Sequence, residues 1–195
     1  MRVNLSVQNV VVVAFFIGTL LHVALRMAVK VRKARLRLRG DVQQAPLFGW
    51  MFAGYFVSLL LSLLEWTLSP WPFQWSVAVV GLAFTAASMF LQYRAFYDLG
   101  PAYSPDIEIR QEHRLVRSGI YGFIRHPLLA SLLLELWGVT LFMNAYATSL
   151  LVGIFYVPVV LYRKREEEKA LCGHFGELYR VYSQEVGGLF PKRFA

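Results

Sequence analysis

The stretch that decides the fold runs from Gly119 to Gly138 and reads GIYGFIRHPLLASLLLELWG. Arg125 and His126 stand directly before a strongly apolar run, and Pro127 marks the boundary. Proline suits the first position of a helix, because its missing N–H would be unpaired there anyway. The N-terminus of a helix carries a partial positive charge and favours anions. Two basic residues at this point therefore predict that an anionic group docks between them.

The whole chain has the composition of a membrane protein. Of its 195 residues, 57% are hydrophobic and only 16% are charged, well away from the average for soluble domains. A helix needs about 20 apolar residues to span a bilayer core about 30 Å thick. Four regions are long and almost free of charge: 10–25, 45–64, 69–93 and 128–161. The last region has room for two crossings joined by a turn at 144–146. The sequence therefore predicts an all-α, polytopic membrane protein with five transmembrane helices.

The basic residues predict how the chain is oriented. All lysines and arginines except Arg2 fall into three groups, within residues 26–39, 94–125 and 163–193. With five crossings, these three groups share one side of the membrane. Cytoplasmic segments carry an excess of Lys and Arg, so we expect the N-terminus outside and the C-terminus in the cytosol, in the inner membrane if the source is a prokaryote. The net charge of +8 then reflects topology and not nucleic-acid binding.

The chain reads as a single membrane domain over residues 1–195. Residues 1–97 would hold three transmembrane helices and a basic linker, which continues the first helix into the cytosol. Its basic cluster follows the apolar stretch, so the first helix is expected to be an anchor and not a signal peptide. Residues 98–195 would hold a folded inner loop, a helical hairpin and a short C-terminal helix. We expect the last transmembrane helix to kink at Pro158 and to break at Gly173.

A second polar segment, RKREEEKAL, spans Arg163 to Leu171. Arg163 with Glu167, and Lys164 with Glu168, have the i,i+4 spacing of ion pairs on a solvated helix. Each such pair contributes about 0.2–0.5 kcal/mol. The segment leaves the membrane on the side where residues 113–127 lie. We therefore expect the two polar segments to face one cavity.

Glu135 stands alone inside the fourth predicted helix. An ionisable residue within the membrane is a functional hypothesis by default. The alternative is a protonated or hydrogen-bonded residue between helices, and the sequence leaves both open. A functional Glu135 would favour an amine or another protonatable substrate.

Two motifs in this order resemble the isoprenylcysteine carboxyl methyltransferase family. The first is HRLVRSGIYGFIRHP at 113–127, and the second is R-x-x-x-E-E-x-x-L-x-x-x-F-G-x-x-Y-x-x-Y at 163–182, followed by LFP. The resemblance covers about 98–191. It implies a methyltransferase that uses S-adenosylmethionine without a Rossmann domain, and the sequence contains no G-x-G-x-x-G loop. Leu129 and Ser131 depart from the family pattern.

The resemblance also implies roles for particular residues, with the cofactor pocket at the cytosolic face between the loop before the fourth helix and the C-terminal helices. Arg163 would face the substrate as a catalytic residue, and Glu135 is the second catalytic candidate. The cofactor would be bound by Glu108, His113, Arg114, Leu115, Val116, Tyr121, Arg125, His126, Pro127, Leu128, Leu129 and Glu167.

The expected reaction is methyl transfer to the carboxylate of a lipophilic or prenylated substrate that enters from the membrane lipid. A carboxylate needs no general base, so catalysis would rest on alignment and on the exclusion of water. Alternatives are phospholipid N-methylation, thiol S-methylation and, less favoured, a non-catalytic membrane protein. Cys172 is the only cysteine, so no disulfide within the chain and no cysteine cluster for a metal is expected. The oligomeric state is left open.

Overall fold

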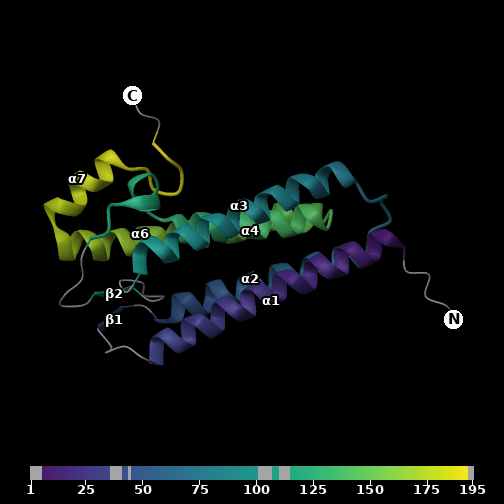
Figure 1. Cartoon of the computed structure of the whole chain (residues 1–195), viewed down its shortest axis with the longest axis horizontal. Coiled ribbons are helices and arrows are strands. Elements are labelled where there is room, and N and C mark those ends of the chain that lie inside the picture. Colours follow the sequence, from purple (N-terminus) through teal and green to yellow (C-terminus); the bar gives the residue numbers. More distant parts are fainter. Residues whose placement is uncertain (1–5, 36–40, 44, 101–106, 110–114, 193–195) are drawn as a thin grey trace.

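The computed structural model describes residues 6–35, 41–43, 45–100, 107–109 and 115–192, with side chains for 6–26, 49–100 and 115–192. Long helices run side by side in two layers (Figure 1). One layer holds α1 (Val7–Arg35) and α2 (Ala45–Leu68), and the other holds α3 (Trp75–Leu99), α4 (Pro127–Phe142) and α6 (Val157–Phe175). The remaining elements are the strands β1 (Asp41–Gln43) and β2 (Ile107–Ile109), the 3-10 turn η2 (Gly119–Gly122), the short helix α5 (Tyr146–Leu151), the π-helical turn η3 (Val152–Tyr156) and α7 (Glu177–Glu185).

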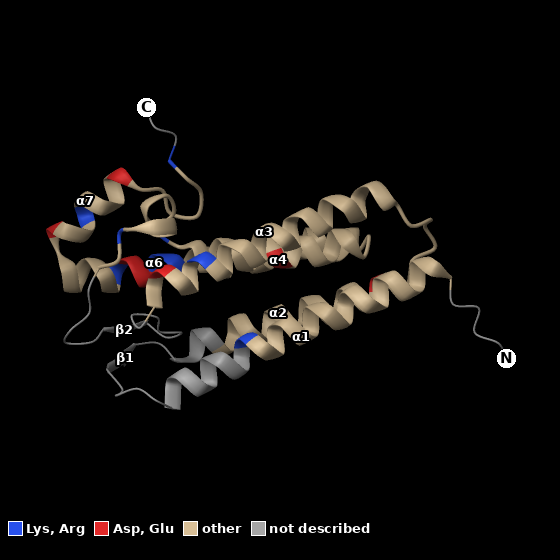
Figure 2. Ribbon diagram, in the orientation of Figure 1, with Lys and Arg blue, Asp and Glu red and all other residues tan. Residues whose placement is uncertain are grey.

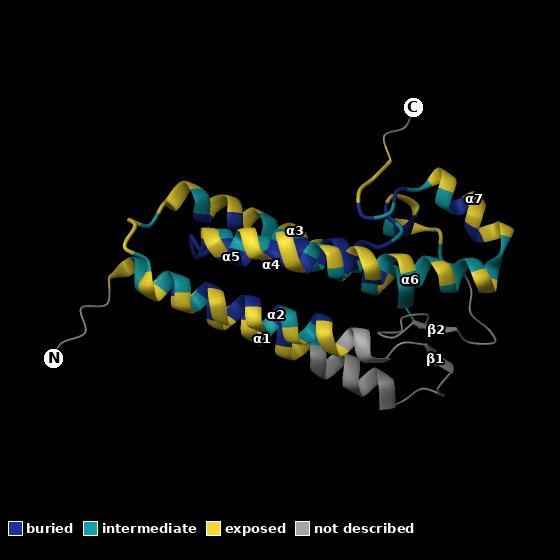
Figure 3. Cartoon of the chain, turned by 180° about the vertical axis from the view of Figure 1, so that it is seen from behind, coloured by how far each residue is buried: buried dark blue, intermediate teal, exposed yellow. Residues whose placement is uncertain are grey.

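Four helical segments are long and apolar enough to cross a membrane, judged over the described residues: Val7–Arg26, Gly49–Leu68, Trp75–Leu99 and Tyr146–Phe175. Exposed residues follow the outer sides of these helices (Figure 3), where a bilayer would cover them. The predicted all-α architecture is therefore confirmed, apart from the small sheet of β1 and β2, with four of the five predicted crossings long and apolar enough to span a membrane. α4 is apolar but has only 16 residues, fewer than the roughly 20 that a crossing needs.

α4 nevertheless runs along α3 in the opposite direction, from one end of it to the other. At one end of the pair, the backbone N–H of Gln74 donates to Asn144 Oδ1 at 2.5 Å. At the other end, Asp98 Oδ2 accepts from the backbone N–H of Ile120 at 2.7 Å. Between these ends, a Cβ atom on Gly138 would overlap Thr85. The two backbones can therefore approach closely because this position is glycine.

The turn between α4 and α5 lies where the sequence predicts it. Asn144 has a φ of 57°, a conformation that asparagine tolerates better than most residues. Glu65, at the end of α2, accepts hydrogen bonds at 2.8 Å from the backbone N–H groups of Ala147 and Thr148. A carboxylate is favoured at a helix N-terminus, so Glu65 fixes the start of α5 against α2.

The predicted break at Gly173 is wrong. α6 continues through Gly173 to Phe175, and Gly176, with a φ of 55°, ends it. Glycine inside a helix costs only about 1 kcal/mol relative to alanine, whereas a residue with positive φ after the last turn is a common helix stop. The short C-terminal helix is confirmed as α7. Near Pro158 the structure shows the π-helical turn η3.

The first helix continues into the basic stretch as predicted, at least to Arg35. After it, β1 pairs antiparallel with β2, with Val42 opposite Glu108. The linker after α1 and the loop after α3 are thereby joined at the backbone. The apolar core between the layers includes Val12, Leu59 and Val139, and the rings of Phe15 and Phe142 stack with centroids 3.7 Å apart.

Candidate active site

The segment before α4 is held in place at both of its ends. Gly119 has a φ of 62°, and a Cβ atom there would overlap the carboxylate of Asp98, so this turn requires glycine. Further on, the backbone N–H of Arg125 donates to Gly187 O at 2.8 Å, and that of His126 donates to Gly188 O at 3.0 Å. The chain after α7 thus returns to bind the residues that begin α4.

α6 contributes two ion pairs that face this segment. Arg163 Nε lies 2.9 Å from Glu167 Oε1, and Lys164 Nζ lies 2.8 Å from Glu168 Oε2. These are the pairs predicted from the i,i+4 spacing. The solvated helix that this spacing alone would indicate does not apply to Arg163, whose side chain is only 5% exposed. The pairs are partly enclosed because the chain around residue 126 packs over them.

His126 lies between the two glutamates of α6. Its Nδ1 is 3.0 Å from Glu167 Oε2, and its Nε2 is 3.2 Å from Glu168 Oε1. Burial lowers the pKa of His126, but the hydrogen bonds that it donates to the two carboxylates outweigh burial and raise that pKa above its ordinary value of 6.5. A protonated imidazole has two N–H donors, so it satisfies both carboxylates at once.

Arg125 holds α7 as well as α6. Its Nη2 lies 2.6 Å from Glu168 Oε1. Its Nη1 donates to the backbone oxygens of Ser183, at 2.5 Å, and Val186, at 3.1 Å. These oxygens lie at the C-terminal end of α7, where a cation is favoured by the helix dipole. Arg125 therefore ties the start of α4 to both C-terminal helices.

We call Arg125, His126, Arg163, Lys164, Glu167 and Glu168 the charged cluster. The sequence predicted an anionic group beside Arg125 and His126. In the structure, the carboxylates of Glu167 and Glu168 provide this negative charge. Two arginines and a lysine face two carboxylates, and a protonated His126 adds to the surplus of positive charge. The charged residues gather around α6 and α7 (Figure 2). The cluster thus carries net positive charge.

The other predicted cofactor residues fall into three sets. Pro127 begins α4 and is buried, as are Tyr121 and Leu129, whereas Leu128 is half-buried. Leu115 and Val116 are half-buried just before η2. His113 and Arg114 lie outside the described residues, and of Glu108 the structure describes only the backbone in β2. The roles of these residues toward a cofactor stay predictions.

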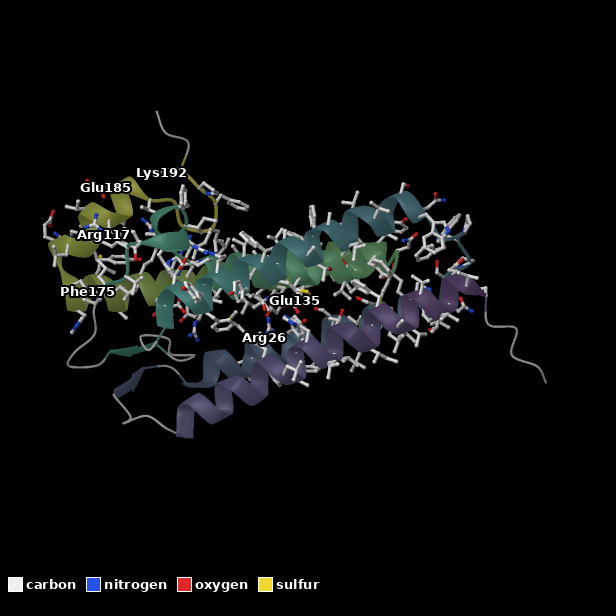
Figure 4. All side chains as sticks on the ribbon, viewed as in Figure 1. Arg26, Arg117, Glu135, Phe175, Glu185 and Lys192 are labelled. Carbon is white, nitrogen blue, oxygen red and sulfur yellow. The ribbon has the colours of Figure 1, made fainter. Side chains whose placement is uncertain are left out.

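Glu135 lies apart from the charged cluster, nine residues along α4 from His126, or about 14 Å by helical rise. It is fully buried. Its Oε2 accepts from Arg26 Nη1 at 2.8 Å and from Gln92 Nε2 at 2.9 Å. The side chains of Arg26 and Glu135 point toward each other from α1 and α4 (Figure 4). This is the hydrogen-bonded alternative weighed from the sequence; a catalytic role for Glu135 stays a prediction.

Sequence reasoning missed two residues at the site. Glu168 contacts Arg125, His126 and Lys164 at once, although its spacing from Lys164 indicated only a surface pair. Tyr179 on α7 is 2% exposed, and the Cζ atom of Arg125 lies 6.0 Å from the centroid of its ring. The sequence signal that could have identified Tyr179 was its position in the second motif, at 163–182.

The sequence of this region matches a known family. Residues 79–173 match the model of the isoprenylcysteine carboxyl methyltransferase (ICMT) family. This part of the chain is therefore similar to the ICMT family. The matched part contains α4, α6 up to Gly173, and every member of the charged cluster.

Three relatives with names are similar to this chain. A methanethiol S-methyltransferase of Pseudomonas sp. is 38% identical over 74 residues, which is 38% of this chain and 27% of that protein. A protein-S-isoprenylcysteine O-methyltransferase of Schizosaccharomyces pombe is 25% identical over 112 residues, or 56% of this chain and 48% of that protein. Protein-S-isoprenylcysteine O-methyltransferase B of Arabidopsis thaliana is 28% identical over 148 residues, 70% of this chain and 73% of that protein. The chain thus spans about half or less of the first two.

Proposed function

We propose that this protein is an integral membrane methyltransferase that uses S-adenosylmethionine and methylates the carboxylate of a lipophilic substrate. The observation that carries the proposal is the position of His126, with Glu167 3.0 Å away across a hairpin of the chain. Both residues lie in the segment that matches the model of the ICMT family. Two short polar segments that meet in this way provide one polar site next to an apolar helix bundle.

We propose five crossings, with α4 as the fourth. α4 begins beside the end of α3 that carries Asp98 and ends beside Gln74, at the other end. It therefore spans the same thickness as α3, which is itself long enough to cross. α4 alone is shorter than α3, and the irregular residues before Pro127 cover the remaining length. With five crossings, the basic segments lie together, and the excess of Lys and Arg places the charged cluster on the cytosolic side.

The charged cluster has the chemical groups that the donor requires. S-adenosylmethionine, when bound, supplies a sulfonium methyl group for displacement by a nucleophile. The donor's carboxylate matches the net positive charge of the cluster, and Glu167 can accept a hydrogen bond from an amino group or a ribose hydroxyl. Tyr121 and Leu129 are buried beside the cluster, so they would help to exclude water. Exclusion of water strengthens the electrostatic contacts within such a site.

Arg163 is our candidate for binding the acceptor. It lies one helical turn from Glu167 on the same side of α6, is buried, and is bound through Nε to Glu167. A guanidinium group binds a carboxylate in a planar, bidentate manner and so fixes its direction. Orientation of this kind contributes about 7–11 kcal/mol in well-aligned intramolecular reactions. No residue has to remove a proton, because the carboxylate is already a nucleophile.

A thiol is the second candidate acceptor. It is favoured by the relative whose name is methanethiol S-methyltransferase, which is 38% identical over the matched residues. A thiol is a weaker nucleophile than its thiolate, so this reaction would depend on pH near the thiol pKa. The amine alternative drew on a functional Glu135, and in the structure Oε2 of Glu135 pairs with Arg26 at 2.8 Å.

The acceptor assignment is tested by replacing Arg163 with Ala in protein reconstituted in nanodiscs. With labelled S-adenosylmethionine and N-acetyl-S-farnesylcysteine, we expect turnover to fall about hundredfold. The Kd of S-adenosylhomocysteine should change little, because Arg163 orients the acceptor. Arg165, which is exposed on the same helix, provides the matched control Arg165→Ala, for which we expect unchanged turnover. Turnover on the carboxylate that survives Arg163→Ala would refute the role of Arg163, and turnover on dodecanethiol alone would favour the thiol.

A further inference from the structure

The groups expected to receive the donor's carboxylate are already engaged by the chain itself. The backbone N–H groups of Arg125 and His126 are bound to Gly187 O and Gly188 O. Both nitrogens of the His126 ring face Glu167 and Glu168. Helix N-termini bind anions through free N–H groups, but the N–H groups of Arg125 and His126 are not free. Other donors beside the cluster are therefore the candidates for binding a carboxylate.

Two buried polar atoms beside the cluster have no hydrogen-bond partner among the described residues: Arg125 Nε and the hydroxyl oxygen of Tyr179. The Arg125 side chain is 10% exposed, and Tyr179 is 2% exposed. The two side chains are adjacent, with 6.0 Å between Cζ of Arg125 and the ring centroid. Unpartnered polar groups are costly to bury, and buried tyrosine hydroxyls usually have partners.

Both atoms are hydrogen-bond donors. Arg125 Nε carries a hydrogen at every accessible pH. Burial raises the pKa of Tyr179, and the nearby charge of Glu168 raises it further, so the hydroxyl keeps its proton. Two donors on adjacent side chains, at a cluster of net positive charge, fit an acceptor group with negative charge. The neighbouring tyrosine Tyr182 differs, because its hydroxyl already donates to Tyr121 O at 2.5 Å.

We propose that the Tyr179 hydroxyl and Arg125 Nε bind the carboxylate of the methyl donor. This inference rests on the proposed function, since it names the part of the donor that α7 recognises. Under this proposal α7 contributes to binding the methyl donor, although α7 lies beyond the residues matched to the family. Arg125 then has two tasks, because its two Nη atoms hold Glu168 and the end of α7, while Nε faces the donor's carboxylate.

The test compares two ligands on two variants. The ligands are S-adenosylhomocysteine and its decarboxylated form, which differ only in the carboxylate. In Tyr179→Phe we expect the Kd of S-adenosylhomocysteine to rise about tenfold, the loss of a hydrogen bond to a charged group. The Kd of the decarboxylated ligand should stay the same. The Tm of the ligand-free variant should not fall, because the deleted hydroxyl has no partner.

Tyr182→Phe is the matched control. It removes a hydroxyl that is bonded within the chain, so its Tm should fall while both Kd values keep their ratio. If Tyr179→Phe weakens neither ligand, or weakens both equally, the carboxylate assignment is overturned. If wild-type protein binds neither ligand in calorimetry, the proposed function itself fails, and this outcome is distinct from failure of the inference alone.

Discussion

At the scale of single residues, His126 makes the stability of the charged cluster depend on pH. Burial lowers its pKa, yet the hydrogen bonds that His126 donates to Glu167 and Glu168 hold the pKa above 6.5 in the folded protein. In the unfolded chain the pKa returns to about 6.5. The folded state therefore binds the proton more tightly, and this contribution to stability is complete below about pH 6.5 and is lost as the pH rises through the higher, folded value.

We predict that the Tm of the wild-type protein in detergent falls between about pH 6.5 and the folded pKa of His126. His126→Asn serves as the control, since asparagine keeps a polar side chain but does not titrate. The difference in Tm between wild type and this variant should be largest at low pH and should shrink as the pH rises. A difference that is constant with pH would show that His126 is not protonated between the two carboxylates.

The arrangement of secondary-structure elements depends on one buried polar contact as well as on apolar packing. Arg26 on α1, Gln92 on α3 and Glu135 on α4 meet between the two layers (Figure 4). Arg26 lies outside the residues matched to the family, while Gln92 and Glu135 lie inside them. The contact therefore joins the N-terminal layer to the part of the chain that carries the charged cluster.

Replacing Arg26 alone should destabilise the protein more than replacing Arg26 and Glu135 together. Arg26→Met leaves the buried carboxylate of Glu135 without its cation, which costs about 3–5 kcal/mol for a buried pair. The double variant Arg26→Met, Glu135→Gln removes both charges and should recover most of that loss. Unfolding by denaturant in mixed micelles measures the three stabilities.

A double variant that is no more stable than Arg26→Met would contradict this account of the pair. Methyl-transfer activity adds a second measurement, because Glu135 is also a predicted catalytic residue. Glu135→Gln should keep its turnover wherever its fold is intact, if the carboxylate serves only to join helices. Loss of turnover with an unchanged Tm would assign Glu135 to the reaction.

Sequence patterns are informative about elements and about contacts between near neighbours. Long uncharged runs indicate the membrane helices, and Asn144 marks the turn between α4 and α5. The i,i+4 spacing of Arg163 and Glu167 gives their contact directly. Gly173 misled the prediction of the end of α6, because glycine weakens a helix without ending it, and the positive φ at Gly176 is not visible in sequence.

Contacts between distant residues were harder to predict. Arg26 and Glu135 are 109 positions apart, and nothing local in the sequence indicates that they meet. Arg125 binds backbone oxygens at the end of α7, and backbone oxygens carry no residue-specific signal. The meeting of His126 and Glu167 was predicted because two polar segments flank a hairpin and so must leave the membrane on the same side.

At the scale of the whole molecule, two layers of membrane helices support one polar site at one end. The charged residues gather around α6 and α7 (Figure 2), while the outer sides of the long helices are apolar and exposed (Figure 3). Under the proposed function, a lipophilic acceptor in the bilayer and a water-soluble donor would meet at this end. The polar end and the apolar helix sides are separated because, along the chain, the segments with mixed charge lie between or after the apolar helices.

The central claim is that His126 and Glu167 form one donor site, and calorimetry of S-adenosylhomocysteine binding in detergent tests it most directly. We predict saturable binding to the wild-type protein, and a Kd about tenfold or more higher for Glu167→Gln, with unchanged binding for Glu177→Gln at an exposed position on α7. Absence of binding to the wild-type protein, or equal Kd values for wild type and Glu167→Gln, would contradict the claim.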